Sequence, residues 1–139
     1  MANEKLKKDD GAKRVDETTY KSLVGSLLRL TATRPDIMFA ASLLSRFMNN
    51  PSKLNFTAVK RVLKYIKGTI NYDIWSGPVE NSKLIGYIDS DWTRCADDMK
   101  STSGYVVSLR SGLCLWSSKK LSVVTLSSVE AEHIARAVT

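Results

Sequence analysis

The chain has 139 residues, of which 43% are apolar and 25% are charged. This balance is typical of a globular protein and excludes a disordered tail, a collagen and a coiled-coil rod. The 21 Lys and Arg exceed the 14 Asp and Glu, giving a net charge of +7 that favours polyanionic partners.

Apolar runs and the first residues indicate the cellular setting. The short apolar run Ile37–Ala41 falls well below the roughly 18 residues that a membrane span requires, so we expect no membrane partner. Residues 1–10 mix both charge signs and lack an apolar stretch, which is unlike a secretory signal or a transit peptide. The expected localisation is therefore intracellular.

The chain has few residues that could bind zinc or form a Ser-His or Cys-His catalytic site. The chain contains Cys95, Cys114 and a single histidine, His133. Structural zinc needs about four Cys or His ligands at close spacing. A serine triad would depend on His133, and no G-x-S-x-G turn is present to expose the serine. Both kinds of site are disfavoured.

The first ordered element follows a charged leader. Residues 1–17 carry many charges and few apolar groups, which predicts a flexible leader. Beyond it, apolar residues recur with the period of a helix that buries one face. They are Tyr20, Leu23, Val24, Leu27 and Leu28. We therefore expect a helix over about 19–31.

A second helix is predicted from Pro35 to about Met48. Proline suits the first turn of a helix, and Asp36 lies near the positive end of the helix dipole. Apolar residues cover most of the circumference between Ile37 and Met48. Such a helix is expected to pack between neighbours.

A third helix combines an apolar side with a basic side. Ser52 is a suitable N-cap and Gly68 a suitable stop, so the helix should end at about Lys67. No acidic residue occurs between Asp36 and Asp73. The candidate nucleic-acid-binding residues of this region are Arg46, Lys53, Lys60, Arg61, Lys64 and Lys67. A one-signed stripe of this kind favours nucleic acid, although a solvated helix face is an equal alternative.

After Gly68 the pattern changes from helical to alternating. Residues 69–82 are interpreted as a linker, followed by a strand over 84–89 and a hairpin of residues 104–109 and 113–117. A short extended piece at 123–125 and a helix that starts at Ser127 complete the plan. The predicted fold class is α+β.

Two groups of acidic residues could carry chemistry. Asp89 and Asp91 follow an apolar strand and would point to the same side, where they could share a divalent cation such as magnesium. A solvated turn explains the same pair. Glu130 stands three residues after Ser127, which is the spacing of a capping box, so helix initiation alone could account for it.

Eight motifs in one order resemble copia-type retrotransposon Pol polyproteins. The resemblance covers about residues 18–138. Its motifs are Tyr20–Leu27, Thr33–Ile37, Leu44–Met48, Lys60–Thr69, Asp89–Trp92, Lys100–Tyr105, Trp116–Lys120 and Ser127–Glu132. Eight ordered motifs are far more specific than any one of them.

The resemblance implies the junction between reverse transcriptase and ribonuclease H. Residues 18–68 would be a helical thumb-like or connection-like segment, and residues 83–139 a truncated ribonuclease H-like mixed sheet with one helix. By the resemblance, Asp89 and Glu130 match the first two catalytic acids, with Asp91 as a further possible metal ligand. In the family these acids bind two Mg²⁺ ions, which Mn²⁺ can replace, and cleave the RNA strand of an RNA/DNA hybrid.

Departures from the family pattern limit the expected activity. The third and fourth catalytic aspartates do not occur in the chain, and His133, Leu121 and Asn55 replace the usual residues. We expect weak magnesium binding and little or no turnover by the chain alone. The alternative is a non-catalytic remnant that binds hybrid or duplex through the basic helical segment. An incomplete sheet also predicts self-association through its exposed edge.

Overall fold

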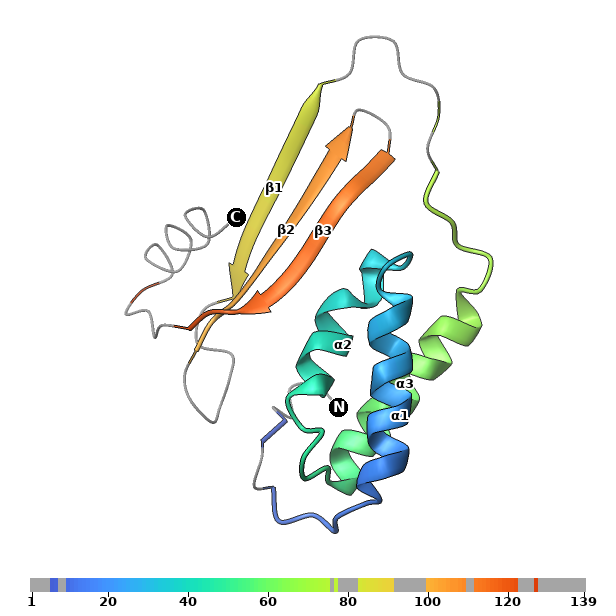
Figure 1. Cartoon of the computed structure of the whole chain (residues 1–139), viewed down its shortest axis with the longest axis vertical. Helices are drawn as coiled ribbons and strands as arrows, with labels where there is room; N and C mark the ends of the chain where they lie inside the picture. Colours follow the sequence, from blue (N-terminus) through green and yellow to red (C-terminus); the bar gives the residue numbers. More distant parts are fainter. Residues whose placement is uncertain are drawn as a thin grey trace. The chain divides into compact units, whose positions relative to one another are not determined.

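A computed structural model of the chain describes most of its residues: 6–7, 10–75, 77, 83–91, 100–109, 112–122 and 127. The chain divides into two compact units, Met1–Tyr72 and Asp73–Thr139 (Figure 1). The described helices lie in the first unit and the described strands in the second, and each unit is described by itself. The coarse class, α+β, is confirmed.

The helical unit contains α1 (Glu17–Leu30), the 3₁₀ turn η1 (Pro35–Ile37), α2 (Met38–Ser45) and α3 (Lys53–Gly68). Asp16 caps α1, because its carboxylate accepts the Thr19 backbone N–H at 2.7 Å. This cap starts the helix at Glu17, two residues before the predicted start. Ser52 caps α3 as predicted, by accepting the Asn55 N–H at 3.3 Å.

One apolar core joins the three helices. Tyr20 and Val24 of α1, Ala41 of α2 and Val59 of α3 are all fully buried. The remaining core members, each at most 5% exposed, are Leu27, Ile37, Leu44 and Phe47. Of the predicted apolar face of the first helix, Tyr20, Val24 and Leu27 form the core, whereas Leu28 is 37% exposed and the prediction was wrong for it.

The second helix is shorter than predicted and less enclosed. It begins as a 3₁₀ turn at Pro35, and the α-helical part ends at Ser45 instead of about Met48. Although α2 contacts both α1 and α3, Phe39 remains 41% exposed. The expected packing between neighbours is thus observed, and the side of the helix that carries Phe39 remains exposed.

The end of the predicted leader contacts the start of α3. Lys53 N–H donates to the Lys13 carbonyl at 2.8 Å, and Val15 N–H donates to the Pro51 carbonyl at 3.0 Å. Arg14 forms an isolated antiparallel bridge with Ser52. Residues 13–15 are thus held against the helical unit, which differs from a flexible leader that extends to residue 17.

The sheet unit is an antiparallel meander in the order β1–β2–β3 (Figure 1). Its strands are β1 (Leu84–Asp91), β2 (Thr102–Leu109) and β3 (Gly112–Lys120). The predicted strand and hairpin are observed with longer strands, and a β-bulge interrupts the β2–β3 register between Val107 and Ser108. The expected extended piece at 123–125 and the helix after Ser127 lie outside the described residues.

Among the described helices, none has both the length and the apolarity that a bilayer crossing requires.

Candidate nucleic-acid interface and acidic strand

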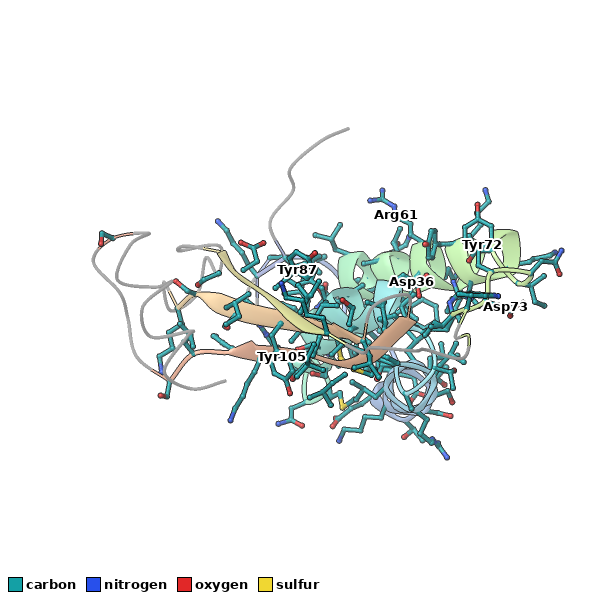
Figure 2. The ribbon with its side chains drawn as sticks, turned by 90° about the horizontal axis from the view of Figure 1, so that it is seen from above. Asp36, Arg61, Tyr72, Asp73, Tyr87 and Tyr105 are labelled. Atoms are coloured by element: carbon teal, nitrogen blue, oxygen red, sulfur yellow. The ribbon has the colours of Figure 1, made fainter. Side chains whose placement is uncertain are left out.

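Helix α3 displays a narrow stripe of cations on its exposed side. Lys53, Lys60, Lys64 and Lys67 are all exposed and lie within about 60° of one another around the helix axis. Arg61 flanks the stripe, and its side chain extends away from the other helices (Figure 2). At 1.5 Å per residue the stripe is about 21 Å long, so several phosphates could contact it at once.

The opposite side of α3 fixes the orientation of this stripe. Val59 is fully buried, and Val62 and Ile66 pack partly buried against the core. Burial of these apolar groups prevents α3 from turning its cations inward. Lys60 also lies over the ring of Phe56, with its Nζ atom 4.9 Å from the ring centroid.

Arg46, the sixth predicted cation, is placed differently. It follows α2 at the C-cap position and is only partly exposed. The α3 stripe is therefore a separate cluster from Arg46.

A polar cluster that the sequence did not predict holds the C-terminal end of α3. Arg34 donates to both oxygens of Asp36, at 2.9 Å and 2.7 Å, and to the Thr69 carbonyl and hydroxyl at 3.2 Å and 2.7 Å. The Tyr65 hydroxyl donates to Asp36 at 3.0 Å. This cluster joins the segment before η1 to the end of α3.

The same cluster compensates the charge of Asp36, an acid that lies near the C-terminal end of α3. Arg34 beside Asp36 lowers the pKa of that carboxyl, and Asp36 in turn raises the pKa of Arg34. The hydrogen bond to Asp36 raises the pKa of the Tyr65 hydroxyl. The negative charge of Asp36 is thus compensated locally and does not neutralise the lysine stripe. The adjacent Arg34–Pro35–Asp36 triplet marked a helix start, but nothing in the sequence indicated its contact 35 residues away.

The N-terminal end of α3 is held by the leader. Ser52 is fully buried, and its hydroxyl donates to the Asp10 carboxylate while it caps the helix. The Ser52 hydrogen bond is the main reason that the pKa of Asp10 is lowered. A negative charge near a helix N-terminus is also favourable. Contacts at both ends therefore hold the basic helix in place.

The acidic strand supplies one candidate metal ligand that the structure describes fully. Asp89 is exposed on β1 and lies opposite Gly104 of β2, so no side chain of that neighbour covers it. The backbone of Asp91 ends the same strand opposite Thr102. The other predicted acid, Glu130, lies outside the described residues.

No cluster of three or more His, Cys, Asp or Glu side chains able to hold a metal occurs in the part of the chain that the structure describes. The described residues therefore do not surround Asp89 with a set of metal ligands. Carboxylate oxygens suit Mg²⁺, but a two-metal site requires further acids around it.

Comparison with known proteins identifies relatives over nearly the whole chain. It is 43% identical, over 129 residues, to the retrovirus-related Pol polyprotein from transposon RE1 of Arabidopsis thaliana. The aligned region covers 93% of this chain and 9% of that protein. The Pol polyprotein from transposon TNT 1-94 of Nicotiana tabacum is 41% identical over 84% of this chain and 9% of its own length.

A shorter relative is covered almost completely. Secreted RxLR effector protein 161 of Plasmopara viticola is 40% identical over 84% of this chain and 82% of its own length. No family model and no solved structure matches the chain. The chain thus spans 9% of the length of the Pol polyproteins from RE1 and TNT 1-94.

Proposed function

Because the chain belongs to the retrovirus-related Pol polyproteins of copia-type transposons, we propose that it is a Pol segment that binds nucleic acid through the basic side of α3. The observation that carries this proposal is the exposed stripe of Lys53, Lys60, Lys64 and Lys67 opposite a buried apolar side. The ligand would be an RNA/DNA hybrid or another duplex, bound through its phosphates.

In the proposed interaction the lysines contact the phosphates of the nucleic-acid backbone and do not recognise its base sequence. Lysine ammonium groups bind phosphates as point charges, and neutralised phosphates release their counterions. Binding should therefore weaken steeply as salt rises and should depend little on base sequence. The charge of Asp36 is compensated by Arg34, so this carboxylate competes little with phosphates for the stripe.

The test compares two lysine variants of equal charge change. Lys64→Ala removes a cation from the α3 stripe, whereas Lys119→Ala removes an exposed cation from β3. Fluorescence anisotropy with a labelled RNA/DNA hybrid, recorded from low to high salt, should show that Lys64→Ala reduces the slope of log affinity against log salt by about 1. Lys119→Ala should leave the slope unchanged. Equal effects of the two variants would refute a specific role for α3.

The second candidate function is cleavage of RNA in the hybrid by a ribonuclease H-like site. Asp89 supports it, because this exposed carboxylate follows an apolar strand. In this proposal Asp89 and Glu130 would hold Mg²⁺ or Mn²⁺, with Asp91 as an additional ligand, and the bound ion would supply Lewis-acid activation of the attacking water. Residues 18–68 would then be the thumb-like or connection-like segment and residues 83–139 the ribonuclease H-like part.

Cleavage of a labelled hybrid with magnesium or manganese tests this second candidate. We expect the chain alone to give little or no product, because a pair of acids lacks the charge to hold two divalent cations well. Product that disappears in both Asp89→Asn and Glu130→Gln would establish the site and would contradict the expected inactivity. Product that persists in both variants would exclude these residues as its source.

A further inference from the structure

Among the described strands, β1 has the largest number of exposed large apolar side chains. Every residue from Lys83 to Asp89 is exposed, although this stretch contains four large apolar side chains. Leu84 is 65% and Tyr87 63% exposed. The exposure includes both faces of the strand, because Leu84 and Tyr87 project to opposite sides of it and both are exposed. Tyr87 and Tyr105 of the neighbouring strand likewise lie on opposite sides of the sheet (Figure 2).

The outer edge of β1 also lacks the features that keep strands from pairing. From Leu84 to Ile88, β1 contains no proline and no charge, and its register with β2 is unbroken. The edge at β3 differs, because a bulge interrupts its pairing and Lys119 and Lys120 end it. Bulges and edge lysines oppose intermolecular pairing, so β1 is, of the two edges of the described sheet, the one that can accept another strand.

The charge order along β1 specifies the strand that fits. Lys83 precedes the apolar stretch and Asp89 follows it, so an antiparallel second copy would place opposite charges together at both ends. A parallel copy in register would place like charges together. We propose that two copies of this chain pair antiparallel through β1, forming one continuous six-stranded sheet.

One register satisfies the charges and the apolar side chains together. With the twofold axis at Gly86, Lys83 of each copy faces Asp89 of the other. Ile85 then faces Tyr87, and Leu84 faces Ile88 on the opposite side of the sheet. Directly opposed residues of antiparallel strands share a face, and aromatic–β-branched and opposite-charge pairs stabilise such a ladder. The interface is isologous, so it closes as a dimer rather than a filament.

This inference is independent of the proposed nucleic-acid binding, because it uses none of the α3 cations. In the dimer, the Asp89 carboxylate, which is also the candidate metal ligand, faces the Lys83 ammonium of the other copy. Where the dimer forms, that ammonium competes with a metal ion for the carboxylate.

Charge reversal provides a test that depends on the register. In a dimer of Lys83→Glu, the new carboxylate of each copy faces the Asp89 carboxylate of the other. In a dimer of Asp89→Lys, the new ammonium group of each copy faces the Lys83 ammonium of the other. We expect each variant alone to weaken dimerisation at least about tenfold. An equimolar mixture of the two should restore it, because every opposed pair is then of opposite charge. Sedimentation velocity of the full chain over a range of concentrations measures these outcomes.

Lys119→Glu is the matched control, since it makes the same charge change at the other edge of the sheet. It should leave the dimer intact, and far-UV circular dichroism should show unchanged secondary structure in all variants. A wild-type chain that stays monomeric, a ladder of larger species, or a mixture that fails to dimerise would each overturn the proposal. Loss of the dimer in Lys119→Glu would also overturn it, by assigning the interface to β3.

Discussion

The two units of the chain bury their apolar residues to very different extents. In the helical unit, Tyr20, Val24 and Val59 are fully buried in a core shared by three helices. In the sheet unit, Leu84, Tyr87 and Leu115 remain more than half exposed. Apolar burial supplies most of the free energy of folding, so the helical unit contains the elements of an independent fold. The described strands, by contrast, display apolar surface suited to a partner.

The largest expected difference comes from equivalent substitutions in the two units. Leu27 is 2% exposed and Leu84 is 65% exposed. Leu27→Ala should lower the free energy of unfolding of the helical unit by about 2–5 kcal/mol, because it opens a cavity in a closed core. Leu84→Ala should change the stability of the monomer by less than about 0.5 kcal/mol.

Two spectroscopic signals separate the units during urea unfolding. All three tryptophans, Trp75, Trp92 and Trp116, belong to the sheet unit, whereas α1, α2 and α3 account for the described α-helix. Leu27→Ala should shift the far-UV circular dichroism transition and leave the tryptophan fluorescence transition in place. Equal shifts of both signals would mean that the units unfold together.

An intermediate effect is expected from the buried hydroxyl of the helical core. Tyr20 is fully buried and donates to the Leu44 carbonyl at 2.9 Å, and burial raises the pKa of Tyr20 to about 12. In the unfolded chain the tyrosine hydroxyl has its ordinary pKa of about 10. The stabilisation is complete below pH 10 and is lost as the pH rises from 10 to about 12. The shift of about two pKa units corresponds to roughly 2–3 kcal/mol.

Tyr20→Phe tests the origin of this alkaline loss. At neutral pH the variant should lose about 1 kcal/mol with its hydrogen bond, and its stability should then fall less steeply above pH 10 than that of the wild type. Tyr72→Phe is the control, because Tyr72 is 67% exposed. Urea unfolding at a series of pH values measures both slopes, and an unchanged slope in Tyr20→Phe would contradict the prediction.

In the helical unit, the sequence predicted the positions and buried faces of the helices better than the contacts between them. The 3.6-residue period placed Tyr20, Val24 and Leu27 on a buried face, and Ser52 and Gly68 marked the ends of α3, because these signals are local. The 3₁₀ start at Pro35 and the exposed Phe39 depend on how α2 packs, which periodicity does not specify.

The candidate sites divide in the same way. The cation stripe of α3 followed from helical spacing alone, and the structure places its lysines on the exposed side. The Arg34–Asp36–Tyr65 cluster joins residues up to 31 positions apart, so no local pattern could indicate it. Asp89 was correctly expected near the end of a strand, whereas its partnership with Glu130 came from family resemblance and remains a prediction.

The smallest change in the free energy of unfolding is expected at a buried side-chain amide of the helical unit. Asn55 lies in the first turn of α3 and is fully buried, yet neither its Nδ2 nor its Oδ1 atom has a hydrogen-bond partner among the residues that the structure describes. A buried amide without partners costs free energy, whereas an apolar side chain of similar size does not. Asn55→Leu should therefore raise the free energy of unfolding of the helical unit by about 1 kcal/mol, widening its difference from the sheet unit.

Urea unfolding followed by circular dichroism measures this gain, and Asn50→Leu is the matched control. Asn50 is exposed just before α3, so the same replacement there removes no buried unpaired group. The Asn55 backbone N–H still donates to the Ser52 hydroxyl in the variant, so the helix cap is retained. Destabilisation by Asn55→Leu would mean that the amide makes compensating hydrogen bonds in solution, because only a satisfied amide is costly to remove. The helical core would then be complete without the substitution.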